Sequence, residues 1–194
     1  MKTPLSYQVT PNDSAPVAII NALSNLYERE ELDSYLIEGI YTLSYNLLVS
    51  KESNGTEGIC HISRFLEREM KERGLAVKYL CSHEVFLGPG CSLYRTLVNG
   101  GKAVAKIFSK DGVRYITITS LTNDYLYYFD PYYGTECGED IEILTHMPFL
   151  ANKRIKMSNL SQVASAHVKG IKQEEKELVL FERVKQYIVL YPCP

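Results

Sequence analysis

The chain has 194 residues, of which 45% are hydrophobic and 23% are charged, so it can bury a sizeable core and general disorder is excluded. Its formal net charge of -2 argues against a nucleic-acid binder, because such proteins usually carry an excess of basic residues. No apolar run approaches the roughly 20 residues that a membrane-spanning helix needs.

The first residues contain no apolar stretch of the kind that marks a secretory signal. The five cysteines are odd in number and none forms a C-x-x-C pair, so a disulfide framework is not expected. We therefore expect a protein of the reducing cytoplasm without a membrane partner. Nothing in the pattern favours a particular oligomeric state.

Apolar residues at helical spacing predict helices in the first part of the chain. The first helix begins near Ser14, where Asp13 or Ser14 can cap it and Pro16 fits the first turn. The third ends at Gly74, a residue type common after a helix C-terminus. The expected ranges are about 14–30, 33–49, 56–74 and, for a short fourth helix, 92–98.

The periodicity then changes to that of strands, which are expected over 76–80, 103–108, 113–119, 125–129 and 178–189. Turn sequences such as Lys110-Asp111-Gly112 separate neighbouring strands. Helices followed by an antiparallel meander are typical of an α+β fold. We interpret the chain as one domain, with a helical half over about 12–100 and a sheet half over about 101–194.

Polar residues stand at the beginnings and ends of these elements in a recurring order. Gln8 lies six residues before Ser14 at a helix start, Arg114 lies at the start of a strand, and Asp130 ends the next strand in the run Asp130-Pro131-Tyr132. In this order the chain resembles the peptidase C39-like branch of the papain-fold cysteine peptidases. The resemblance implies a papain-like cysteine-peptidase fold, in which N-terminal helices pack on an antiparallel β-sheet.

In that family a cysteine at the helix start is the nucleophile, a histidine on a strand is the base, an aspartate orients the histidine, and a glutamine stabilises the oxyanion. The resemblance implies that Gln8 matches the oxyanion glutamine and Asp130 the orienting acid. Ser14 stands at the nucleophile position and Arg114 at the histidine position. The four histidines, at 61, 83, 146 and 167, all lie away from the start of the 113–119 strand.

These replacements predict a site that has lost its chemistry. A serine without an adjacent base is a weak nucleophile, and arginine stays protonated near neutral pH. Losing both groups costs on the order of a million-fold in rate. We therefore interpret the protein as a pseudopeptidase that needs no cofactor or metal, in which Arg114 and Asp130 form a charge-assisted pair. Its cleft would bind a peptide or peptide-like ligand, with contacts from Tyr128, Tyr132 and Tyr133.

Other readings stay open. An active thiol peptidase, amidase or acyltransferase whose nucleophilic cysteine is replaced by Ser14 is one, and a structural module that shares only the fold is another. Ser14 can also be a helix cap, and Asp130-Pro131 a turn that ends a strand. A zinc site built from Cys60-His61 and Cys81-Ser82-His83 lacks the usual ligand spacing, and Cys60 fits a small buried hydrophobe better.

Overall fold

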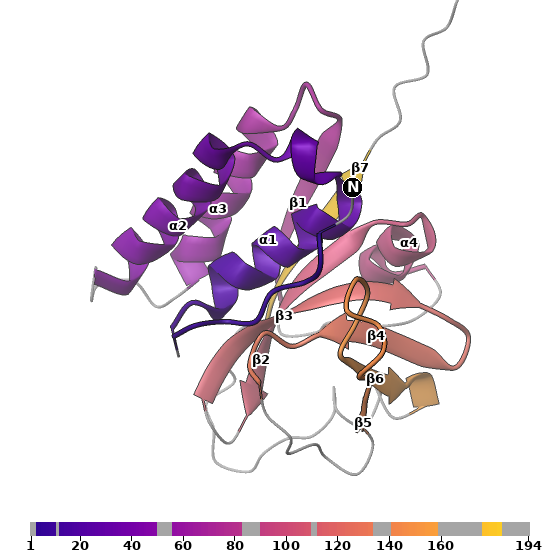
Figure 1. Ribbon diagram of the computed structural model, residues 1–194. Coiled ribbons are helices and arrows are strands. Elements are labelled where there is room, and N and C mark those ends of the chain that lie inside the picture. The colour runs from indigo at the N-terminus through magenta and orange to yellow at the C-terminus, as the bar shows by residue number, and fades with distance from the viewer. Residues whose placement is uncertain are drawn as a thin grey trace, which may run out of the picture.

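The computed structural model describes residues 3–10, 12–49, 56–82, 90–109, 112–133, 141–158 and 176–183. Within these ranges the chain forms four α-helices, a short 3-10 helix and one seven-stranded sheet (Figure 1). All strand pairs in the sheet are antiparallel. The α+β class expected from the order of elements is confirmed. No helix in the described ranges combines the length and the apolar character needed to cross a membrane.

The helices lie close to the predicted ranges, but the first and the third end earlier than predicted. The first helix stops at Leu26 because Tyr27 takes an extended backbone (φ -117, ψ 158), and the chain then forms the separate 3-10 helix. The third helix stops at Glu69 and a turn carries the chain to Gly74, whose φ of 74 suits glycine. The bounds are α1 Ser14–Leu26, η1 Arg29–Glu31, α2 Ser34–Val49, α3 Thr56–Glu69 and α4 Ser92–Val98.

The sheet contains two strands that the sequence pattern did not predict. No strand is predicted between residues 129 and 178, but the chain forms two short strands there, β5 and β6, of which β6 pairs with β4 and β5 pairs with β6. The last expected strand begins at 176, and its residues 184–189 lie outside the described ranges. The bounds are β1 Leu75–Ser82, β2 Lys102–Ser109, β3 Gly112–Leu121, β4 Tyr125–Phe129, β5 Ile141–Ile143, β6 Lys153–Lys156 and β7 Lys176–Arg183.

The strand order is β1-β7-β2-β3-β4-β6-β5, so β7 lies between β1 and β2, the first strand of the meander. Phe181 in β7 pairs with Val77 of β1 on one side and with Lys102 of β2 on the other. Phe181 is fully buried. The strand formed last along the described chain therefore joins β1 to the rest of the sheet.

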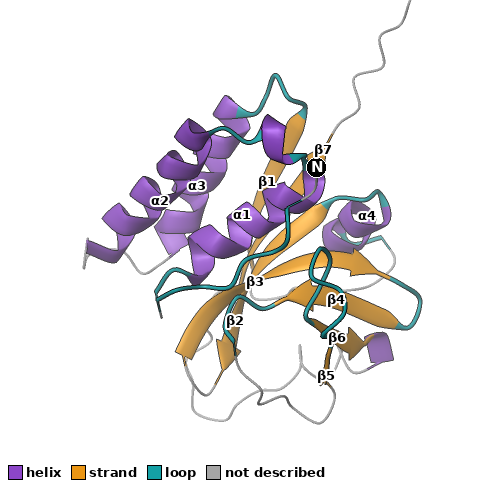
Figure 2. Cartoon of the chain, viewed as in Figure 1, coloured by secondary structure: helices purple, strands orange, loops and turns teal. Residues whose placement is uncertain are grey.

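Helices α1, α2 and α3 lie together beside the sheet, apart from α4 (Figure 2). Two hydrophobic clusters use alternate residues of β2 and β3, so they lie on the two faces of the sheet. The first joins α1, α2 and α3 to Val104 and Phe181, and Tyr115 packs against it. The second joins α4 to Ile116 and Ile118. Because successive side chains of a strand point to opposite faces, Arg114 lies on the same face of β3 as Ile116, whereas α1 covers the other face.

Candidate functional site

The predicted pair of Arg114 and Asp130 is present. Asp130 follows the last residue of β4 and is 1% exposed. Its Oδ2 accepts a hydrogen bond from Nη2 of Arg114 at 2.9 Å, and its Oδ1 accepts one from the backbone N–H of Tyr132 at 3.1 Å. The side chain of Arg114 is 16% exposed, so the pair is almost entirely shielded from water.

A lysine that the sequence analysis did not single out completes this ion cluster. Nζ of Lys153 donates to the same Oδ2 of Asp130 at 2.9 Å. The side chain of Lys153 is 6% exposed. The register between β4 and β6 places Lys153 opposite Tyr128, two residues before the carboxylate, and this brings the ammonium within reach. We call Arg114, Asp130 and Lys153 the ion cluster.

The backbone of Asp130 is also fixed, by the residue before Lys153. Oδ1 of Asn152 accepts from the N–H of Asp130 at 2.8 Å, and Nδ2 of Asn152 donates to its carbonyl at 2.8 Å. The amide thus pairs with Asp130 much as a neighbouring strand would. Burying ions is costly unless they are paired and held in place, and residues 152 and 153 meet both conditions for this carboxylate.

Ser14 contacts the backbone of β3, the strand that carries Arg114, but does not join the ion cluster. It is the first residue of α1 and is 5% exposed. Its Oγ accepts a hydrogen bond from the backbone N–H of Tyr115 at 3.3 Å. The pairing of β3 with β4 begins only at Thr117 and Phe129, so this N–H projects past the end of the ladder and can reach the serine. Tyr115 directly follows Arg114 in the chain.

No histidine among the described residues contacts Ser14. His61 lies on α3 and His146 lies in the segment after β5, and both are exposed. His83 and His167 lie outside the described ranges. In the described part of the chain, Arg114 stands where the family has its histidine, and its guanidinium binds Asp130.

Gln8 reaches the same region through its backbone. Its N–H donates to the carbonyl of Pro131 at 3.0 Å, next to Asp130. Its side-chain Nε2, the donor that an oxyanion role requires, donates instead to the carbonyl of Thr10 at 3.0 Å. Its Oε1 is buried and accepts no hydrogen bond from the described residues.

The loop between Gln8 and α1 is organised by Asp13. Its carboxylate accepts from the backbone N–H groups of Val9 and Thr10, at 3.1 Å for each nearest oxygen. Asp13 precedes α1 but makes no side-chain cap on the helix. The capping role that the sequence suggested for Asp13 is therefore wrong, because the carboxylate turns back to bind the loop before the helix. Burial, and then the charge of Asp13, raise the pKa of Tyr41 on α2.

Hydrogen bonds link the four residues that the sequence singled out to the beginning of β3 or the end of β4, although α1 and the side chain of Arg114 lie on opposite faces of β3. Arg114 binds Asp130 directly, Ser14 binds the residue after Arg114, and Gln8 binds the residue after Asp130. Within the described ranges no hydrogen bond joins Ser14 to Arg114, Asp130 or Gln8. The arrangement can hold a fixed ion cluster, and it offers Ser14 no proton acceptor there.

The tyrosines expected to bind a ligand separate into two groups. Tyr128 is 7% exposed and belongs to the cluster that includes Leu93 and Leu97 of α4, so it offers a ligand little surface. Tyr132 and Tyr133 are 38% and 78% exposed. Tyr7, which the sequence analysis missed, adds its ring at 5.4 Å from that of Tyr133. We call Tyr7, Tyr132 and Tyr133 the aromatic rim.

The aromatic rim lies directly against the ion cluster. Cζ of Arg114 is 5.2 Å from the centroid of the Tyr132 ring, a cation–π distance. The Tyr7 ring also packs on Phe129, the residue before Asp130, at 5.0 Å. Exposed aromatic surface and buried charge therefore adjoin at the end of β4.

The cysteine and metal candidates do not form a site in the described part of the chain. Cys60 and Cys91 are free and half-buried, so Cys60 is less buried than expected. No group of three or more histidine, cysteine or acidic side chains that could hold a metal ion occurs among the described residues. The side chains of Cys81 and His83 lie outside them.

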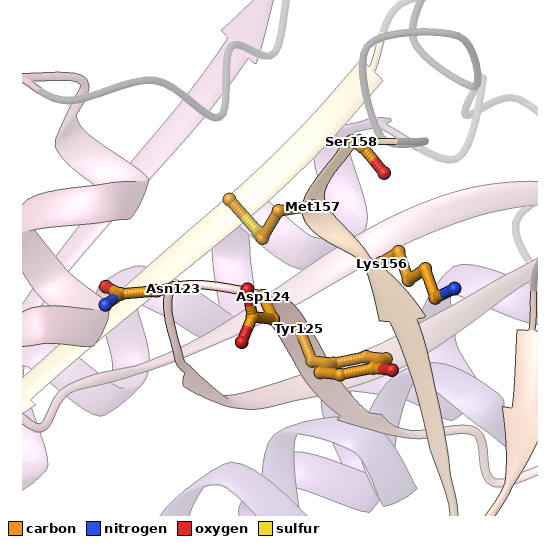
Figure 3. Close-up of a pocket in the computed structure, with 6 residues that line it drawn as sticks. All are labelled: Asn123, Asp124, Tyr125, Lys156, Met157 and Ser158. Atoms are coloured by element: carbon orange, nitrogen blue, oxygen red, sulfur yellow. The ribbon is translucent and has the colours of Figure 1, made fainter.

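A shallow pocket of about 350 Å³ lies at the other end of β4, away from Asp130 (Figure 3). It is formed by the turn between β3 and β4 and by the end of β6. Its lining residues are Asn123, Asp124, Tyr125, Lys156, Met157 and Ser158.

Comparisons of the chain with models of protein families, with curated proteins and with solved structures find no significant match.

Proposed function

We propose that this protein is a catalytically degenerate, C39-like member of the papain fold that binds a peptide or peptide-like ligand without cleaving it. The observation that carries the proposal is the bond of 2.9 Å between Arg114 and Asp130, at the positions where the family has its histidine and its orienting acid. A guanidinium that stays protonated cannot take the proton of Ser14. The pair therefore favours a retained site without its reaction.

The placement of Ser14 supports the same ancestry. A papain-like nucleophile stands at the start of a long helix that packs on an antiparallel sheet. Ser14 is the first residue of α1, and its hydroxyl approaches β3 next to Arg114. A serine that served only as a helix cap would not need this contact with the strand of Arg114.

The aromatic rim supports binding of a peptide. Tyrosine offers a flat apolar ring with one polar end, which suits the mixed surface of an extended peptide. Tyr133 is 78% exposed, so its ring gains most from a ligand that covers it. The free thiols of Cys60 and Cys91 are compatible with a reducing compartment, and we include a cytoplasmic location in the proposal.

The proposal can be tested by capture of peptides on the immobilised full chain, from a pool of N-acetylated random hexapeptides, with mass spectrometry of the bound and unbound fractions. We expect enrichment of a subset of intact peptides. The Tyr133→Ala variant should reduce that enrichment about tenfold, whereas Tyr45→Ala, which removes a 66% exposed tyrosine from α2, should not change it.

Two results would contradict the proposal. Equal retention by the Tyr133→Ala and Tyr45→Ala variants would separate binding from the aromatic rim. Peptide fragments that accumulate with time in the presence of the wild-type chain, and not with Ser14→Ala, would show that the site is an active enzyme.

A further inference from the structure

We propose that the pocket at the other end of β4 from Asp130 binds a small zwitterion of the size of an α-amino acid. In this proposal Asp124 receives the ammonium group of the ligand and Lys156 receives its carboxylate. The site goes beyond the proposed function, because neither the ion cluster nor the aromatic rim contributes to the pocket.

The pocket is built on a part of the sheet that hydrogen bonds hold in place. Across the turn between β3 and β4, the N–H of Thr122 donates to the carbonyl of Tyr125 at 2.8 Å, and the hydroxyl of Thr122 accepts from the N–H of Tyr125 at 3.0 Å. The N–H of Met157 donates to the carbonyl of Asp124 at 2.8 Å, which fastens the end of β6 to this turn. A ligand would therefore meet walls that are already ordered, and binding would not have to pay for ordering them.

Two opposite charges line this pocket without neutralising each other. Tyr125 and Lys156 are paired residues of β4 and β6, and Asp124 directly precedes Tyr125. In the described part of the chain, the carboxylate of Asp124 and the ammonium of Lys156 form no ion pair, either with each other or with another side chain. Figure 3 shows the ends of the two side chains apart, with the Tyr125 side chain between them in this view. Both residues are exposed, so each charge can be reached by a group of opposite sign.

This pair of charges favours a ligand that carries both signs. A simple anion would be attracted by Lys156 but repelled by Asp124, and a simple cation would meet the reverse, whereas a zwitterion satisfies both groups. The pocket volume of about 350 Å³ is near the lower end of the range for small-molecule sites. The volume therefore suits a ligand of amino-acid size.

Two further lining side chains suit the apolar part of such a ligand. Met157 is half-buried and packs against the hydrophobic cluster that includes α4. Tyr125 is also half-buried, and Cζ of Arg154 lies 4.1 Å from the centroid of its ring, which helps to fix the position of the ring. An aliphatic chain could contact the thioether and the aromatic ring while the charged end of the ligand binds Asp124 and Lys156.

The test uses L-norleucine and the two molecules that result from removing one of its charged groups, hexanoate and pentylamine. Each is titrated into the isotope-labelled full chain, and the amide chemical shifts are followed by NMR. We expect norleucine to shift the amides of residues 123–125 and 156–158 with a dissociation constant in the millimolar range, because both charged contacts are exposed. Hexanoate and pentylamine should each bind about fivefold more weakly.

Two variants separate the roles of the charges. In Asp124→Asn, norleucine should bind about fivefold more weakly and no better than hexanoate, and in Lys156→Gln it should bind no better than pentylamine. The matched control Lys71→Gln removes an exposed charge after α3 and should leave the three affinities unchanged.

The comparison of the three molecules needs only the wild-type chain, so it decides the question even if a variant does not fold. Hexanoate or pentylamine that binds as tightly as norleucine would overturn the inference, and so would shifts confined to residues outside the pocket or no shifts at all. None of these results bears on peptide binding at the aromatic rim, so the proposed function would stand or fall separately.

Discussion

Replacing Asp130 by asparagine should be among the most destabilising isosteric changes in this protein. Asparagine has nearly the same shape, so the packing around the 1% exposed side chain is kept. The change removes the carboxylate that Arg114 and Lys153 share. Both cations then lose this carboxylate in an environment that is shielded from water.

The cost follows from that loss. Removing one partner of a buried ion pair typically destabilises a protein by about 3–5 kcal/mol. The amide oxygen that replaces the carboxylate can still accept one hydrogen bond, so we expect the lower end, about 3 kcal/mol. For a chain of 194 residues this corresponds to a fall in melting temperature of roughly 6–12 °C.

Urea denaturation followed by circular dichroism would measure the free energy of unfolding. The matched control is Glu142→Gln, which makes the same carboxylate-to-amide change in the ion pair with Arg154, where Glu142 is 47% exposed. That change should cost less than about 1 kcal/mol, because exposed pairs contribute little. Adding Lys153→Met to Asp130→Asn should recover at least about 1 kcal/mol, since it removes a shielded cation that has lost its carboxylate.

The reasoning fails if Asp130→Asn costs no more than Glu142→Gln. It also fails if the double variant is less stable than Asp130→Asn alone, because the penalty would then not come from uncompensated charge.

Three further predictions concern other residues. In the Ser14→Cys variant, the new thiol should react with iodoacetamide more slowly than Cys60, because position 14 is 5% exposed and has no described base beside it. Mass spectrometry of each site would measure both rates, and faster labelling at position 14 would support an active thiol site. Gly101→Ala should lower the free energy of unfolding by about 1–3 kcal/mol, because a Cβ there would stand 2.7 Å from the carbonyl oxygen of Phe181. Gly39→Ala is the control and should cost less, since its Cβ meets only the tip of the Phe65 ring. Equal costs of the two changes in urea denaturation would contradict this prediction. Burial raises the pKa of Tyr27 above its ordinary value of 10.0, although Arg183 opposes the shift, so the stability that the neutral phenol contributes is present below pH 10 and is lost as the pH rises through the raised pKa. Unfolding measured between pH 9 and about 11.5 should therefore show a steeper loss of stability for the wild type than for Tyr27→Phe, and parallel curves would refute the assignment.

The parts of the fold that local patterns determine could be predicted from the sequence. Apolar spacing located α2 and α4, and a turn between alternating segments located β3 and β4. β5 and β6 could not be found in this way, because a run such as Lys153-Arg154-Ile155-Lys156 becomes a strand only by pairing with β4. The end of α1 was misplaced for a related reason, since Tyr27 leaves the helix to bury its ring beneath Arg183.

In the candidate site, too, the residues on predicted strands could be identified from the sequence, and the residue on an unpredicted strand could not. Arg114 and Asp130 could be paired in advance, because each stands at an identifiable end of a predicted strand. Lys153 could not, because its place depends on the register of an unpredicted strand. The burial of Tyr128 could not be predicted, since its position in a tyrosine-rich run does not tell which face of β4 it occupies, and that face packs in the cluster with α4.

The position of β7 has a consequence for how the protein is made. β1 pairs only with β7 among the described strands, and β7 is also the neighbour of β2. During synthesis β1 therefore has no partner strand until nearly a hundred later residues have been added and β7 is available. Such a long-range closure slows folding and leaves a temporary edge that other chains can join. Nascent chains stalled before residue 176 should for this reason need chaperones more than the finished protein does.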